Sequence, residues 1–172
     1  MLQTRNPQHL LAQSQIIHST AAVEFSITRL SQEISTVLAE ACPVVICVMG
    51  GGIVFAGQLL TQLSFPLEID YVHASRYANE TSGSALVWKA LPKSDLTGRT
   101  VLLVDDILDE GITLLEIQQK CLALGAKEVY CAVLVEKKLN KLKPIQAHFV
   151  GLVVPNAYVF GYGMDVYGWW RN

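Results

Sequence analysis

Residues 101–113 read VLLVDDILDEGIT and combine three features of a ligand site. An apolar run typical of a buried strand delivers Asp105 and Asp106 at its end, and Gly111 then allows a turn into a helix. Backbone N–H groups of residues 109–113 would point outward at that helix N-terminus, where the helix dipole favours a phosphate. Adjacent carboxylates can accept hydrogen bonds from sugar hydroxyls. Together these features predict a sugar-phosphate site.

The same residues also have a purely structural explanation, in which two acids end the strand, Asp109 caps the helix and Gly111 serves the turn. We favour a ligand because three acids beside an apolar strand are costly unless they bind something. The Thr113 hydroxyl would give the phosphate a further donor. The sequence has neither a G-x-G-x-x-G motif after a strand nor the lysine of a P-loop.

Apolar stretches on both sides of this motif alternate between strand-like and helical patterns. They cover residues 44–49, 53–63, 67–74, 100–104, 112–124, 129–135 and 148–154. That order predicts an α/β fold with a largely parallel sheet flanked by helices, in which ligands bind beyond the carboxyl ends of the strands. Residues 6–40 have apolar positions three or four apart, which indicates two amphipathic helices. Polar residues 77–97 interrupt the pattern, and we expect a mobile hairpin or lid there.

Composition limits the kinds of partner. The chain has 172 residues, 51% of them hydrophobic, which suits one well-buried domain. A formal net charge of -2 provides no general attraction to nucleic acid or to an anionic membrane, so we expect neither as a partner. No N-terminal stretch has a secretory pattern, and glycines interrupt the most apolar segment, residues 43–60. We therefore expect a cytoplasmic protein.

Residues 101–113 resemble the signature of the type I phosphoribosyltransferases: an apolar strand, two acids, two apolar residues, Asp, any residue, Gly, any residue and Thr. Residues 40–171 further resemble the hypoxanthine-guanine branch of that family. The resemblance implies the type I phosphoribosyltransferase fold, with a small hood beside the core. The expected boundaries are a single domain over 1–172, a core over about 41–154, and a hood from about 1–40 and 155–172.

The resemblance also implies a reaction. The branch works in purine salvage: it transfers the 5-phosphoribosyl group from phosphoribosyl pyrophosphate to hypoxanthine or guanine, giving IMP or GMP and pyrophosphate. Asp109 would act as general acid or base at purine N7. Mg²⁺ is the implied cofactor, with Asp165, Asp105 and Asp106 as the residues that reach it or its waters. Homodimers or homotetramers are the implied assemblies.

Two further segments resemble substrate-binding parts of the family. Met49-Gly50-Gly51-Gly52 is similar to the pyrophosphate loop, where an unusual peptide bond and a close backbone approach would let Gly51 and Gly52 present N–H groups. A tight strand-to-helix turn is the alternative. Arg76 and Tyr77 stand where the family's flexible loop begins, and Arg76 would bind substrate. An ordinary exposed turn stays open as the other explanation.

The base site is implied by the second half of the chain. Lys137 follows a strand, at the place where the family's lysine donates a hydrogen bond to purine O6; Lys138 is a neighbouring alternative. An ammonium donates to a carbonyl but cannot accept from the adenine amino group, so the lysine favours 6-oxopurines. In the tail, Tyr158 would stack on the base, the Val159 backbone would read its edge, and Arg171 would contact pyrophosphate. A solvated surface lysine stays open as the alternative for Lys137, and plain packing as the alternative for Tyr158 and Tyr162.

Two rival functions stay open. One is a relative that prefers xanthine, since Lys137 says nothing about purine C2. The other is a non-catalytic regulator of the same fold that senses phosphoribosyl pyrophosphate. The phosphate loop also departs from the family pattern, because Glu110 and Ile112 replace the usual neutral or basic residues around Gly111. Glu110 must turn away from the phosphate, pair with a cation or weaken binding, and we expect the first two together.

Overall fold

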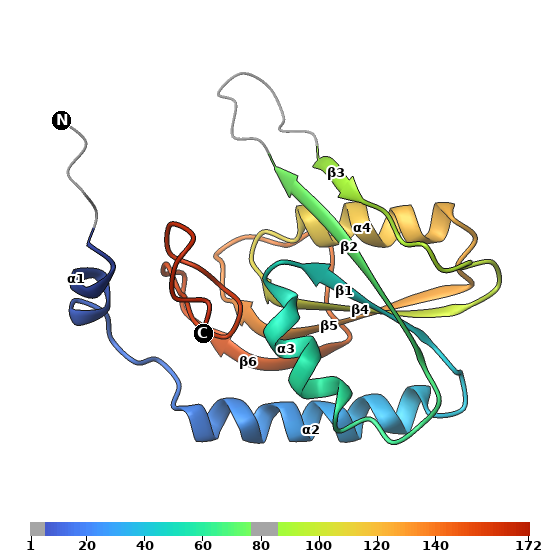
Figure 1. The fold of residues 1–172 in the computed structure, drawn as a ribbon, viewed down its shortest axis with the longest axis horizontal. Coiled ribbons are helices and arrows are strands. Elements are labelled where there is room, and N and C mark those ends of the chain that lie inside the picture. The colour runs from blue at the N-terminus through green and yellow to red at the C-terminus, as the bar shows by residue number, and fades with distance from the viewer. Residues whose placement is uncertain (1–5, 77–85) are drawn as a thin grey trace.

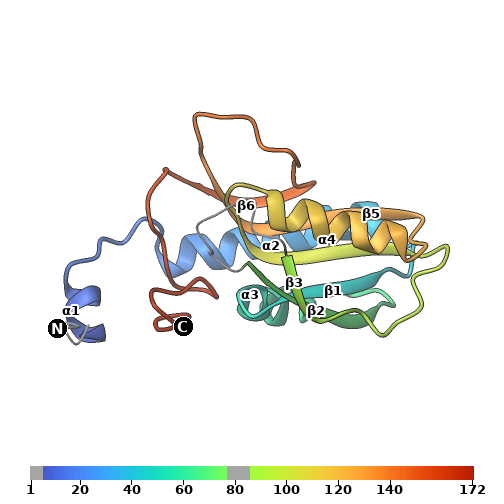
Figure 2. The same ribbon diagram turned by 90° about the horizontal axis from the view of Figure 1, so that it is seen from above.

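The computed structural model describes residues 6–76 and 86–172, which form one sheet with helices on both faces (Figures 1 and 2). The helices are α1 (Pro7–Ala12), α2 (Thr20–Leu38), α3 (Gly52–Leu60) and α4 (Ile112–Ala123). The strands are β1 (Val44–Met49), β2 (Glu68–Arg76), β3 (Leu86–Ala90), β4 (Thr100–Leu108), β5 (Glu128–Lys137) and β6 (Phe149–Val154).

The sheet has the strand order β3-β2-β1-β4-β5-β6. Strands β2, β1, β4, β5 and β6 run parallel to one another, and β3 runs antiparallel to β2. The predicted α/β class with a largely parallel sheet is therefore confirmed. The central strands β1 and β4 are almost fully buried, and β1 and residues 101–104 of β4 are apolar, as expected for strands covered on both faces.

Helices α2 and α3 cover one face of the sheet and α4 covers the other (Figure 1). The buried stripe of α2 includes Ile27, Leu30 and Ile34, which pack into the same core cluster as Phe55 of α3. The spacing of the apolar residues of α2 gives the helix a continuous face that packs on the sheet.

The segment before α2 has the opposite character. Helix α1 buries none of its residues, although its N-terminus is capped by the Asn6 side chain. It lies beside the C-terminal tail, where the Trp170 indole N–H donates to the Pro7 carbonyl oxygen at 2.8 Å (Figure 1). The predicted pair of helices is confirmed, but only α2 is a core helix.

The end of β4 differs from what the sequence predicts, and part of residues 77–97 forms a strand. β4 continues to Leu108, four residues beyond the expected end of that strand, so Asp105 and Asp106 lie within the strand. Of the expected hairpin or lid over residues 77–97, the part 77–85 lies outside the described residues, and residues 86–90 form β3.

No helix in the described part of the chain is long and apolar enough to span a membrane.

Candidate active site

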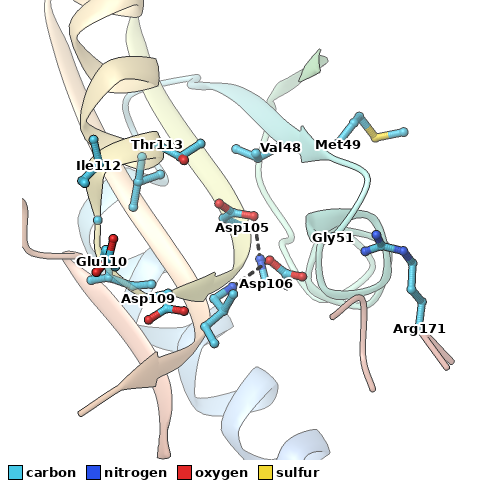
Figure 3. A pocket seen from close by; sticks show the side chains of 14 residues that line it. Val48, Met49, Gly51, Asp105, Asp106, Asp109, Glu110, Ile112, Thr113 and Arg171 are labelled. Carbon is cyan, nitrogen blue, oxygen red and sulfur yellow. Dashed lines mark hydrogen bonds between the residues drawn. The ribbon is translucent and has the colours of Figure 1, made fainter. Parts of the chain in front are cut away.

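The carboxyl ends of β1 and β4 open on a cavity of about 630 Å³. Figure 3 shows the acids of β4 in its centre, the loop before α4 on one side, and Gly51 and Arg171 on the other. Its lining consists of Val48, Met49, Gly51, Asp105, Asp106, Ile107, Leu108, Asp109, Glu110, Gly111, Ile112, Thr113, Leu114 and Arg171. Parallel strands bring these residues together because their carboxyl ends meet at one edge of the sheet.

Asp105 and Asp106 are buried side by side in this cavity, with 9% and 8% of their surfaces exposed. One Asp105 carboxylate oxygen accepts from the Asp106 N–H at 2.9 Å, and Asp106 accepts from the Ile107 N–H at 2.9 Å. Burial, with the neighbouring Asp106 charge, raises the pKa of Asp105 well above its usual range. Burial also raises the pKa of Asp106, although the Arg171 guanidinium opposes this. Hydrogen bonds from hydroxyl groups or a nearby cation would stabilise the charged form of such a pair.

The loop over residues 109–113 (the phosphate loop) joins β4 to α4. Gly111 has φ 83°, in the left-handed region, and a methyl group built there would lie 3.0 Å from Ile145 Cγ2. Both observations explain why glycine is needed at this turn. Gly111 is the N-cap of α4 and has no side chain to cap it, so it does not compete with a ligand for the first-turn N–H groups. The loop geometry therefore suits an anion at the helix N-terminus.

Both acids of the phosphate loop are paired with lysines. The Lys137 ammonium lies 2.6 Å from Asp109 Oδ2, and the Lys141 ammonium lies 2.5 Å from Glu110 Oε1. The expectation that Glu110 pairs with a cation is confirmed. The four residues also line a neighbouring cavity of about 460 Å³, which links Lys137 at the end of β5 to the phosphate loop.

The glycine segment after β1 packs tightly against the acid pair. The Met49–Gly50 peptide bond is cis, as the resemblance implied. A methyl group at Gly51 would lie 2.0 Å from an Asp106 carboxylate oxygen, and one at Gly52 would lie 2.7 Å from the Val104 carbonyl oxygen. The β4 backbone therefore requires glycine at Gly52, whereas a side chain at Gly51 would displace the Asp106 carboxylate.

The C-terminal tail brings Arg171 to the same cavity as Gly51. The Arg171 guanidinium donates to the Gly163 carbonyl oxygen at 2.5 Å and to the Asp165 carboxylate, whose other oxygen accepts from the Gly168 N–H at 2.6 Å. The Tyr158 hydroxyl donates to the Asp165 carbonyl oxygen at 3.0 Å, and its side chain is 71% exposed. A flat exposed ring at this place is accessible to a base.

The expected site residues are not all in one cavity. Tyr158 and Val159 line a separate cavity of about 480 Å³, under the segment that precedes α2. Arg76 is the last residue of β2, and its side chain lies outside what the structure describes, as does Tyr77. The sequence analysis missed Lys141, because a lysine four residues beyond Lys137 has no local signal of its partner.

Comparison with known proteins finds similarity to phosphoribosyltransferases. The model of the phosphoribosyl transferase domain matches residues 13–167. The hypoxanthine-guanine phosphoribosyltransferase of Bacillus subtilis is 31% identical over 159 residues, 91% of this chain and 88% of the relative. The hypoxanthine-guanine-xanthine phosphoribosyltransferase of Tritrichomonas foetus is 30% identical over 159 residues, 91% of this chain and 86% of the relative. A solved hypoxanthine-guanine phosphoribosyltransferase from Bacillus anthracis has a TM-score of 0.85 and 27% identity, covering 92% of this chain and 94% of that one.

Proposed function

This chain belongs to the phosphoribosyl transferase domain family, and on that premise we propose that it is a purine-salvage enzyme, a hypoxanthine-guanine phosphoribosyltransferase. It transfers the 5-phosphoribosyl group from phosphoribosyl pyrophosphate to hypoxanthine or guanine, and it releases IMP or GMP with pyrophosphate. The observation that carries the proposal is the buried Asp105–Asp106 pair beside the phosphate loop, in a chain whose relatives of that name match nine-tenths of its length. We propose that the whole chain acts as one cytoplasmic, self-associating domain.

The phosphate loop would hold the 5′-phosphate. Backbone N–H groups from Glu110 to Thr113 would donate to its oxygens at the positive end of α4, with the Thr113 hydroxyl as a further donor. Gly111 and Ile112 contribute their backbone alone in this proposal. The left-handed turn at Gly111 supports it, because that turn places consecutive N–H groups at the start of the helix.

The acid pair would hold the ribose, with Asp105 and Asp106 accepting hydrogen bonds from its hydroxyls. The carboxylates also fit Mg²⁺: oxygen is its preferred ligand, and a cation would offset the charge of two buried acids. No group of three candidate metal ligands exists among residues 6–76 and 86–172. In proteins, Mg²⁺ is usually bound by one or two carboxylates together with substrate phosphates. Asp165 would reach the metal through water. When bound, Mg²⁺ neutralises charge on the departing pyrophosphate.

Gly51, Gly52 and Arg171 would bind the pyrophosphate. Arg76, the last residue of β2, would bind substrate where the family's flexible loop begins. The closeness of Gly51 to Asp106 and the charge of Arg171 at the same cavity support this assignment. As the bond from ribose C1 to the pyrophosphate oxygen breaks, donors fixed in place would stabilise the charge that develops on the leaving group.

The base would lie between Lys137 and the tail. Lys137 would donate to O6, Tyr158 would stack on the ring, and the Val159 backbone would read the edge of the base. Purine N9 forms the new bond to ribose C1, and Asp109 exchanges a proton at N7 so that the base has the correct charge. The Lys137–Asp109 distance of 2.6 Å supports this pairing of roles, because O6 and N7 lie on the same edge of the purine and two groups this close together could reach both.

A panel of substrates tests the proposal. The protein is mixed with phosphoribosyl pyrophosphate, Mg²⁺ and one of hypoxanthine, guanine, xanthine or adenine, and nucleotide and pyrophosphate are measured. We expect IMP and GMP. Xanthine is the second candidate, favoured by the name of the Tritrichomonas foetus relative, and faster XMP formation would select it. Binding of phosphoribosyl pyrophosphate without turnover of any base would select the regulator.

A further inference from the structure

Two consecutive acids of the phosphate loop are each paired with a lysine from the end of β5 or the segment after it. Asp109 pairs with Lys137 at 2.6 Å, and Glu110 pairs with Lys141 at 2.5 Å. We infer that Lys141 is a positioning residue for phosphoribosyl pyrophosphate: it neutralises Glu110 and keeps that carboxylate directed away from the 5′-phosphate. The inference rests on the proposed function, and it gives a role to a residue outside the proposed substrate contacts.

The charge of the cavity makes such a residue necessary. Among the described residues that line it are four carboxylates and one cation, Arg171. The carboxylates belong to Asp105, Asp106, Asp109 and Glu110. A substrate with several phosphate groups is repelled by each unpaired acid, and one carboxylate 4 Å from a phosphate charge costs about fivefold in affinity even in bulk water. Glu110 belongs to the loop that presents these N–H groups, so the direction of its carboxylate affects phosphate binding.

The segment with Lys141 is anchored to the phosphate loop by other contacts. The Lys143 side chain is only 9% exposed, and its ammonium donates to the Leu108 carbonyl oxygen at 2.9 Å. Ile145 is buried and lies directly against Gly111. These contacts hold the segment against the phosphate loop. They therefore keep Lys141 close enough to Glu110 to pair with it.

Stability does not explain the Lys141–Glu110 pair. The two side chains are 60% and 55% exposed, and solvent-exposed ion pairs contribute little to the free energy of unfolding. Removal of either partner should therefore leave the fold intact. An effect on substrate binding can then be separated from an effect on stability.

A double-mutant cycle tests the inference. Lys141→Met, Glu110→Gln and the double variant are compared with the wild type for the KM of phosphoribosyl pyrophosphate, the KM of hypoxanthine and kcat. Lys141→Met should raise the first KM about three- to tenfold, because Glu110 is then free to turn towards the phosphate. In the Glu110→Gln background the same change should alter that KM by less than about twofold. The KM of hypoxanthine should change little throughout.

Lys127→Met is the matched control, because it removes the same charge at the opposite end of β5, where Lys127 is 71% exposed. It should leave all three constants unchanged. A loss with Lys141→Met that is equally large in the Glu110→Gln background would mean that Lys141 binds phosphate directly, and it would overturn the inference. No change with Lys141→Met would overturn it as well.

Calorimetric binding of phosphoribosyl pyrophosphate with Mg²⁺ to the same variants keeps the two proposals apart. Binding that follows the predicted pattern without turnover by the wild type would refute the enzyme and retain the role of Lys141. Turnover by the wild type without coupling between Lys141 and Glu110 would refute only that role.

Discussion

The Lys137 ammonium lies 2.6 Å from the Asp109 carboxylate, and the lysine is the more buried partner, with 13% of its side chain exposed against 45% for Asp109. The pair connects the end of β5 to the phosphate loop. Under the proposed function a bound 6-oxopurine would share Lys137 with Asp109, because the exocyclic O6 and the ring nitrogen N7 lie on the same edge of the purine. The residue proposed to select the base, Lys137, is therefore in contact with the residue proposed to transfer the proton, Asp109. Substitution of each residue tests the two roles separately.

Lys137→Met keeps an apolar chain of similar length but removes the donor to O6. We expect kcat/KM for hypoxanthine to fall about 10- to 100-fold, the usual range for loss of a hydrogen bond to a charged group. Steady-state kinetics measure the change. Lys138→Met is the control, and a larger loss there would show that Lys138 is the donor.

Asp109→Asn keeps the shape of the side chain and can still accept a hydrogen bond from Lys137, but it cannot exchange a proton. We expect kcat to fall about 100-fold or more. The melting temperature should change little, because Asp109 is partly exposed. Glu40→Gln, at an exposed position after α2, removes an equal charge and should have wild-type activity. An unaltered kcat for Asp109→Asn would remove this residue from the mechanism.

Tyr158 allows a clean separation of ring and hydroxyl. Tyr158→Ala removes the exposed ring and should weaken purine binding by about 1 to 3 kcal/mol, the usual range for stacking of a base on an aromatic side chain. Tyr158→Phe loses only the hydrogen bond to the Asp165 carbonyl oxygen and should bind the purine almost normally. Both affinities can be measured by calorimetry. Equal losses for purine and for phosphoribosyl pyrophosphate would indicate disruption of the tail instead of stacking.

Asp105 should show opposite effects on stability and on binding. Burial and the Asp106 charge raise its pKa, so the folded state keeps the proton to higher pH than the unfolded state. Stability is then lost as pH rises from about 4 through the folded pKa, and Asp105→Asn removes this loss. Its amide oxygen can still accept from the Asp106 N–H.

We therefore expect Asp105→Asn to raise the melting temperature at pH 7 by at least about 2 °C, which corresponds to about 1 kcal/mol in a domain of this size. Affinity for phosphoribosyl pyrophosphate should fall about tenfold with loss of a charged acceptor. Thermal melts between pH 4 and pH 8 and calorimetry measure both. A variant that melts below the wild type would contradict the assigned cost of burying the acid pair.

Local sequence determined much of the fold and the centre of the site. The apolar run before Asp105, the turn at Gly111 and the helical spacing after it predict β4, the phosphate loop and α4, because each depends on neighbours within a few residues. The parallel order of the strands follows from their alternation with helices. The position of α2 on the sheet follows from its amphipathic pattern, which gives the helix one apolar face to bury.

Contacts between residues far apart in the sequence could not be predicted from local sequence patterns. Lys141 and Glu110 are separated by 31 positions, and nothing in the sequence near either residue identifies the other. Asp165 and Arg171 are closer, but their pairing depends on the turns of an irregular tail. Tyr158 and Val159 line a cavity separate from that of the acid pair, so their joint action with it stays a proposal.

A competition assay tests the central claim most directly. The wild-type protein is incubated with phosphoribosyl pyrophosphate, Mg²⁺ and equal amounts of hypoxanthine and adenine, and the nucleotides and pyrophosphate are separated and quantified. The proposed function predicts IMP with an equal amount of pyrophosphate, and AMP lower by a factor on the order of 1,000 or more, as expected for a site with a fixed donor to O6. Comparable amounts of AMP, or no nucleotide at all, would contradict it.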